Sequence, residues 1–270
     1  MNRLMTGIAG VLVVGMFTTG CKEEELTYSE AQQALEETVA STKSEVMAGE
    51  VITLTTSFTI GQAVEDAAEE LRSFVASQVP CSTVTLENAT VTIDFGTLED
   101  ECTFNGHTYA GVASVHIERN DMGDVVVSHE WAGLTNGDVT LDGGATVTWS
   151  FDDGTRHVAH DAVWFDGKRS VHATGDRTQR LIDPELGLAG GIQIDGARRW
   201  DASGKVWDLQ IDGVQMRGQD PVPQAGQYTL TTPEDKEMGL LFERIDEDTI
   251  RVTFTGLKKE HVFEVNSPAK

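Results

Sequence analysis

Residues 145–154 read ATVTWSFDDG and carry the pattern that decides the fold. Every second residue from Ala145 to Phe151 is apolar and the residues between them are polar, so an extended backbone here has one apolar face and one polar face. Asp153-Gly154 follows directly, and an Asp-Gly pair tolerates the positive φ angles of a tight hairpin turn. The stretch therefore predicts a β-strand that ends in a hairpin.

The same alternation continues through most of the chain after residue 80. Apolar and polar residues alternate in four further segments, which are 91–95, 125–131, 207–211 and 250–254. Asn-Gly and Asp-Gly pairs lie between such segments and begin at positions 105, 136, 142, 153, 166, 195 and 212. We therefore predict a mainly β domain over 81–270, built as a long antiparallel meander that forms an open curved sheet or a sandwich.

Two stretches interrupt the strand pattern. Residues 177–191 contain Pro184 and a glycine-rich run, and they predict either a loop that caps one end of the sheet or a link between two halves of it. Residues 220–223 contain two prolines, which cannot donate to a strand ladder, and they predict a second irregular joint.

The residue pattern of the segment before the β domain, residues 29–80, predicts helices. Ser29 and Gln32 match a capping box and predict the start of a helix that runs to about residue 48. Its apolar residues recur at spacings near four or seven and predict one apolar stripe, formed by Ala31, Leu35, Val39 and Val46.

A second helix is predicted over residues 61–77, with Pro80 marking its end. Between the two helices, residues 51–60 are rich in threonine and β-branched side chains, and they predict a short strand or an extended link. We expect the whole segment 29–80 to pack on the β domain or to tether it.

The first residues have the three-part pattern of a secretory signal. Arg3 gives a cationic start, an apolar run extends from Leu4 to Phe17, and small residues follow. The apolar run is about 14 residues long, shorter than the roughly 20 that a membrane-spanning helix needs, so export is favoured over a permanent span.

Thr18-Thr19-Gly20-Cys21 resembles the lipobox of bacterial lipoproteins. The resemblance implies that residues 1–20 are removed and that Cys21 becomes a lipidated first residue, which anchors the chain to the membrane. Residues 21–28 then form an acidic tether that acts as a surface-sorting signal or as a plain spacer. The expected location is the bacterial cell envelope, at the periplasmic face or the outer surface of the outer membrane; the alternative is an ordinary cleaved signal and a free Cys21.

The number of cysteines in the chain predicts one disulfide. The chain has three cysteines, and an exported protein with an odd number requires an explanation for the leftover one. Lipidation of Cys21 leaves Cys81 and Cys102 to pair. The alternatives are two buried thiols or a metal pair, and histidine is missing at the ligand spacing that zinc requires.

The start of the β domain carries a second resemblance. Pro80-Cys81, Val84-Thr85, residues 91–96, Cys102 and Gly106 look like the opening of the β domain in uncharacterised lipoproteins of Gram-negative bacteria. The resemblance covers about 30 residues, supports the compartment and the β architecture, and implies no activity.

Charge and motifs exclude several classes of function. The formal charge of −24 excludes a protein that coats nucleic acid, because such binding depends on cationic side chains. Hydrolase, nucleotide-binding and metalloprotease signatures are missing. His157 and His160 lie next to Asp161 in the sequence. On a strand the two histidines point to opposite faces, so we predict that they are histidines of the sheet surface and form no metal site.

The acidic clusters and the tryptophans leave alternatives open. Acidic clusters that could bind calcium are interpreted as turn residues; they are 120–124, 152–153 and 246–248. Trp149 and Trp207 alternate with aliphatic residues and are expected in the core, whereas Trp164 and Trp200 could contact a ligand.

These observations predict an envelope-anchored lipoprotein without catalytic residues or cofactor. Its β domain would act as a binding or structural module for a glycan, a lipid or an envelope protein, with the helices as stalk and lid. One alternative is a carbohydrate-active or other hydrolytic enzyme that uses two acidic side chains. Another is a carrier of acyl chains, which requires a sizeable apolar cavity between sheet and helices.

Overall fold

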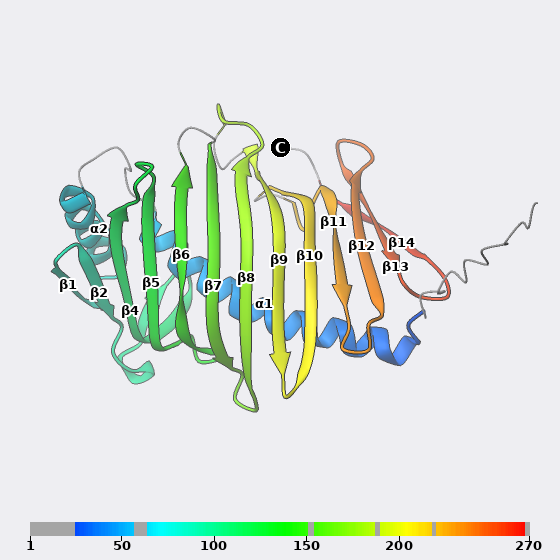
Figure 1. The fold of residues 1–270 in the computed structure, drawn as a ribbon, viewed down its shortest axis with the longest axis horizontal. Coiled ribbons are helices and arrows are strands. Elements are labelled where there is room, and N and C mark those ends of the chain that lie inside the picture. The colour runs from blue at the N-terminus through cyan, green and yellow to red at the C-terminus, as the bar shows by residue number, and fades with distance from the viewer. Residues whose placement is uncertain (1–24, 57–63, 151–153, 187–189, 218–219, 268–270) are drawn as a thin grey trace, which may run out of the picture.

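A computed structural model describes residues 25–56, 64–150, 154–186, 190–217 and 220–267. It shows two helices followed by 14 antiparallel strands (Figure 1). The helices are α1 (Tyr28–Thr56) and α2 (Val64–Gln78), and a short 3₁₀ helix spans Leu98–Asp100. The strands are β1 (Thr83–Glu87), β2 (Thr90–Asp94), β3 (Cys102–Phe104), β4 (His107–Arg119), β5 (Val125–Thr135), β6 (Thr140–Ser150), β7 (Thr155–Phe165), β8 (Ser170–Leu181), β9 (Ile192–Ala202), β10 (Lys205–Met216), β11 (Ala225–Thr231), β12 (Glu237–Arg244), β13 (Thr249–Thr255) and β14 (His261–Asn266).

The strands form one open sheet in chain order. The order runs from β1 through β2 and β4 to β14, and the short β3 pairs with β4 beside this path. This confirms the predicted meander and shows the open-sheet form of it among the described strands. Apart from β2, which pairs with β4, each strand pairs with the next one along the chain, because turns rich in glycine and Asx residues connect most of them.

The sheet has an inner face, which packs against the helices, and an outer face. Val127, Val147 and Val158 lie opposite one another on β5, β6 and β7, and all three are buried on the inner face. Thr146 and Thr148 point to the outer face, so the alternation predicted for the described part of 145–154 is confirmed. The core therefore lies between the inner face and the helices.

Helix α1 crosses the inner face from one part of the sheet to another (Figure 1). Near its start, the Glu30 carboxylate lies 2.8 Å from the Lys236 ammonium, just before β12. Near its end, the Thr55 hydroxyl is 2.7 Å from a ring nitrogen of His129 on β5. Helix α2 packs against β1, β2 and β4, and the Cys81–Cys102 disulfide joins the chain after α2 to β3, as predicted.

The structure corrects the predicted ends of the first helix. Its cap is formed by Thr27 and Glu30, whose side chains accept hydrogen bonds from each other's backbone N–H, and not by Ser29 and Gln32. The helix also continues to Thr56, so the short strand or extended link predicted over 51–60 is wrong for 51–56, and 57–60 lie outside the described residues. Burial of this last part of α1 outweighs the weak strand preference of its β-branched residues.

The predicted apolar stripe of α1 lies mostly outside the buried contact between the helix and the sheet. Leu35, Val39 and Val46 are 40%, 58% and 53% exposed, and of the stripe only Ala31 is buried. The sheet-facing surface is instead rich in small side chains, which let the helix axis approach the sheet closely. Its alanines and serines are Ala31, Ala34, Ser41, Ser44 and Ala48.

The irregular stretch predicted over 177–191 begins later than expected. Residues up to Leu181 belong to β8, and β9 starts at Ile192, while 187–189 lie outside the described residues. Residues 220–223 form the predicted joint, between β10 and β11.

Candidate functional site

A cavity of about 390 Å³ lies between one side of α1 and strands β8 to β12. This volume falls within the range of about 300–1,000 Å³ that is usual for small-molecule sites. Most of its lining consists of aliphatic, methionine and aromatic side chains. The lining residues include Ile194, Leu209, Ile211, Tyr228, Leu240 and Phe242 from the sheet and Leu35, Thr38, Thr42 and Val46 from α1.

The strand alternation places these apolar side chains on the inner face. Ile211 of β10 lies opposite Tyr228 of β11, which lies opposite Leu240 of β12. These three side chains are only partly buried, although they occupy the apolar phase of their strands. The cavity is therefore a part of the inner face that α1 does not cover completely.

A buried group of charged side chains closes one end of the cavity. Glu45 of α1 lies 2.8 Å from Nη1 of Arg177 on β8, and 3.0 Å from Nε2 of His160 on β7. Its side chain is only 9% exposed. The His160 ring lies over Gly175, where an added Cβ would be 2.2 Å from ring carbon Cε1, so only glycine leaves room for the ring.

These contacts control the charge of Glu45. Burial by itself would raise the pKa of its carboxyl, but the close contact with His160 and the positive charge of Arg177 outweigh burial. The pKa is lowered from 4.5 to about 2. Glu45 is therefore ionised at neutral pH, and it fixes the middle of α1 to the sheet.

Arg198 of β9 adds a second guanidinium to the lining of the cavity. The residue is 7% exposed, its Nε has no hydrogen-bond partner among the described residues, and its Cζ lies 5.2 Å from the Trp200 ring centroid. Burial lowers the pKa of Arg198, and nearby Arg177 lowers it further while Glu45 raises it. The cavity thus combines an apolar wall with a buried cation that lacks a close counter-ion.

The structure corrects the predicted surface position of one histidine near this site. His157 and His160 do point to opposite faces, but His160 is buried beneath α1, with a side-chain exposure of 6%, and not on the sheet surface. His157 lies on the outer face, where its Nε2 is 2.7 Å from Asp176. His160 is buried because α1 supplies Glu45 as its partner.

Trp164 and Trp200, for which the sequence left core and ligand contact open, are core residues. They are 1% and 0% exposed, because both occupy the apolar phase of inner-face strands. Trp200 stacks on Trp207 with ring centroids 6.2 Å apart. Trp207 is in the core as predicted, and Trp149 packs against the core while remaining partly exposed.

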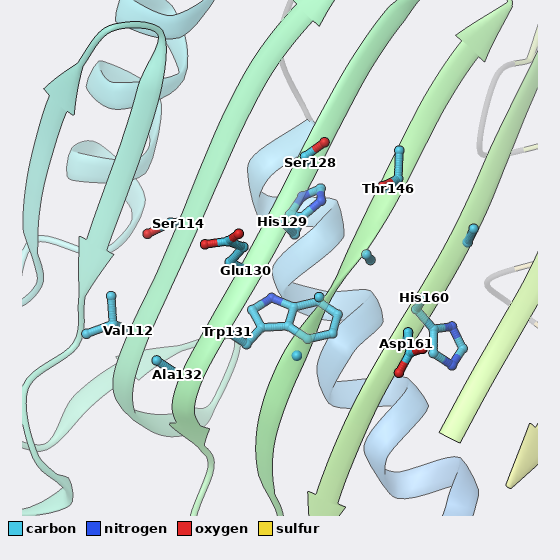
Figure 2. Close-up of a pocket in the computed structure, with 14 residues that line it drawn as sticks. Val112, Ser114, Ser128, His129, Glu130, Trp131, Ala132, Thr146, His160 and Asp161 are labelled. Atoms are coloured by element: carbon cyan, nitrogen blue, oxygen red, sulfur yellow. The ribbon is translucent and has the colours of Figure 1, made fainter. Parts of the chain in front are cut away.

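A second, shallow hollow of about 750 Å³ lies on the outer face (Figure 2). It forms where the side chains are small, such as Ser114, Gly144 and Ala159. Glu130 and Asp161 lie on either side of Gly144 in the register, on strands that β6 separates. The Asp161 side chain is 75% exposed and contacts His172 at 2.7 Å, so it lacks the apolar surroundings that a catalytic acid requires.

The other candidate residues have structural roles or lie outside the described part. Asn120 and Asp246 each accept backbone hydrogen bonds within their own turns, as expected for turn residues. Cys21 and the cluster 152–153 lie outside the described residues. Within the described ranges, no three histidine, cysteine or acidic side chains are grouped closely enough to hold a metal ion. The described helices include none that is both long and apolar enough to cross a membrane.

Comparison with known proteins gives no relative for this chain, since no family model, no curated protein and no solved structure matches it. Glu45, Arg177 and Arg198 were not singled out from the sequence. One sequence signal could have identified the two arginines, namely a charged residue at a strand position whose side chain points to the apolar face. Arg198 is such a residue, since it lies two residues before the buried Trp200 and so shares its face.

Proposed function

We propose that this protein is an envelope-anchored lipoprotein that binds an apolar ligand in the cavity between α1 and β8 to β12, without catalysing a reaction. The observation that carries the proposal is the apolar wall of this cavity of about 390 Å³. Lipidation of Cys21 would hold the binding domain at the outer membrane of a bacterial envelope, with the membrane itself as the partner of the anchor. The ligand class is then a molecule available at a membrane, namely one that contains an acyl chain.

The lining favours an acyl chain over a glycan. A glycan site uses exposed aromatic rings as platforms together with polar groups, whereas Trp164 and Trp200 are buried. Met216 and Met238 line the cavity, and flexible methionine side chains adapt to ligands of irregular shape. Each buried methylene group would contribute about 0.8 kcal/mol to binding, so chain length is the main source of affinity.

The hydrolase alternative has less support. The outer-face hollow presents Glu130 and Asp161, but the Asp161 side chain is largely exposed and is engaged with His172. The aromatic residues that such an enzyme would present to a sugar are in the core.

Binding can be measured with a series of straight-chain alcohols, which have no charge. The Cys21→Ser variant would be used because it keeps every other residue and removes the attached acyl chains. Calorimetric titration with octanol, decanol and dodecanol should show saturable binding, with affinity rising about fourfold per methylene group. Absence of saturable binding for all three alcohols would overturn the proposal.

Two neighbouring residues provide a matched pair of variants. Leu240 lines the cavity, whereas Leu241 points to the outer face and is 44% exposed. Leu240→Trp should fill the cavity and abolish alcohol binding, while Leu241→Trp should leave it unchanged. Equal effects of the two changes would place the binding site elsewhere.

The anchor has its own test. Labelling cells with radioactive palmitate should mark the unaltered protein and not the Cys21→Ser variant. Unchanged labelling of the variant would refute lipidation at Cys21.

A further inference from the structure

The cavity has a polar end whose charges do not balance. Three charged side chains line it, and these are Glu45, Arg177 and Arg198. Both carboxylate oxygens of Glu45 are already engaged, one by Arg177 and the other by His160, which lies behind them. Arg198 is left without an acidic side chain within ion-pair distance among the described residues, so the lining carries one positive charge in excess.

A buried guanidinium without a counter-ion is costly, because it loses water and gains no partner in return. The contact with the Trp200 ring satisfies one face of Arg198, but its N–H groups lie in the plane of the guanidinium and require acceptors. The Tyr228 side chain also lines the cavity, where the charges of Arg198 and Arg177 act on its hydroxyl. These groups form a set of donors at one end of an apolar wall.

We infer that the bound amphiphile ends in a carboxylate that is held by Arg198, with its apolar chain along β9 to β12. This inference rests on the proposed function and names the ligand class of the same site. A planar carboxylate matches the paired N–H groups of a guanidinium. A single negative charge would neutralise the excess charge of the lining, which favours a long-chain monocarboxylate over a doubly charged phosphate ester.

The test compares dodecanoate with dodecanol on the Cys21→Ser protein at neutral pH. The two probes share one chain and differ in the head group. Dodecanoate should bind about tenfold or more tightly than dodecanol, because hydrogen bonds to charged groups are worth more than neutral ones. Dodecyl phosphate should bind more weakly than dodecanoate, and the reverse order would overturn the monocarboxylate class.

Arg198→Met should remove the preference for the acid, so that dodecanoate and dodecanol bind this variant with similar affinity. Arg199→Met is the matched control, since Arg199 is the next residue, points to the outer face and has a side chain that is 61% exposed. It should keep the preference, although it changes the net charge by the same amount. Arg198→Lys keeps the positive charge and loses the planar pair of N–H donors, so it should reduce the preference for dodecanoate without abolishing it. This variant takes the place of Arg198→Met if Arg198→Met fails to fold.

The outcomes separate this inference from the proposed function. If dodecanol and dodecanoate bind equally tightly, the carboxylate class is refuted and the apolar site stands. A preference for the acid that persists in Arg198→Met would refute the assignment of Arg198. If neither probe binds, the proposed function itself fails.

Discussion

Replacement of Glu45 by Gln should lower the free energy of unfolding by about 3 kcal/mol near neutral pH. Among the described residues that line the cavity, Glu45 supplies the only carboxylate. It contacts Arg177 at 2.8 Å and His160 at 3.0 Å. Gln has nearly the same shape, so the change removes the charge and little packing. Arg177 would then be left buried without a counter-ion, next to Arg198.

The magnitude follows from the pKa of Glu45. Its lowering from 4.5 to about 2 corresponds to about 3 kcal/mol, since each factor of ten in proton affinity is worth about 1.4 kcal/mol. Removal of one partner from a buried ion pair typically costs about 3–5 kcal/mol, which agrees. Because the folded-state pKa lies below the unfolded value, this stabilisation is fully present above about pH 4.5 and is lost as the pH falls through about 2.

Urea unfolding followed by tryptophan fluorescence provides the assay. The difference in unfolding free energy between the unaltered protein and Glu45→Gln should be about 3 kcal/mol near pH 7 and should shrink below about pH 4.5. Glu36→Gln is the control, because Glu36 is exposed on the same helix and its replacement should change stability by less than about 0.5 kcal/mol. A difference that stays the same from neutral to acidic pH would refute the role of the carboxylate charge.

Three further perturbations have defined outcomes. Burial lowers the pKa of His129 from 6.5 to about 4. The free energy of unfolding should therefore fall by about 3 kcal/mol as the pH is lowered from 6.5 to about 4. Urea unfolding of His129→Leu should not show this loss. The cysteines of the Cys81–Cys102 disulfide are 21 residues apart, so its reduction should lower the free energy of unfolding by about 3 kcal/mol. Equal urea midpoints with and without reductant would contradict this. Trp164→Ala should cost about 3–5 kcal/mol because the ring is 1% exposed, and a change below about 1 kcal/mol in urea unfolding would contradict its place in the core.

The meander could be predicted because its signals are local. Period-two alternation and Asx-Gly turns act within a few residues, and strands that pair with their neighbours in sequence need no long-range information. The disulfide followed from cysteine count and compartment. The sequence did not predict that the sheet is open rather than folded into a sandwich. Alternation indicates that each strand has an apolar face, but it does not indicate which element covers that face.

The orientation of α1 and the charged end of the cavity could not be predicted for related reasons. A count of apolar side chains selected the stripe with Leu35 and Val39, whereas the sheet contacts the small residues on the opposite side of the helix. Glu45 looks like an ordinary surface residue of a helix until β8 and β9 place Arg177 and Arg198 beneath it. The partners lie on elements far apart in the sequence, so only the tertiary arrangement brings them together.

The path of α1 has a consequence for the order in which the molecule assembles. Each hairpin of the sheet closes a short loop, whereas Glu30 of α1 and its partner Lys236 are 206 residues apart, and the entropy lost on closing a loop grows with its length. Helix α1 precedes all the described strands in the chain, so its start can dock only after the residues around Lys236 have been synthesised. Refolding should show an early phase of sheet formation and a later phase of helix docking, and the apolar wall beside β9 to β12 is accessible to other molecules between the two.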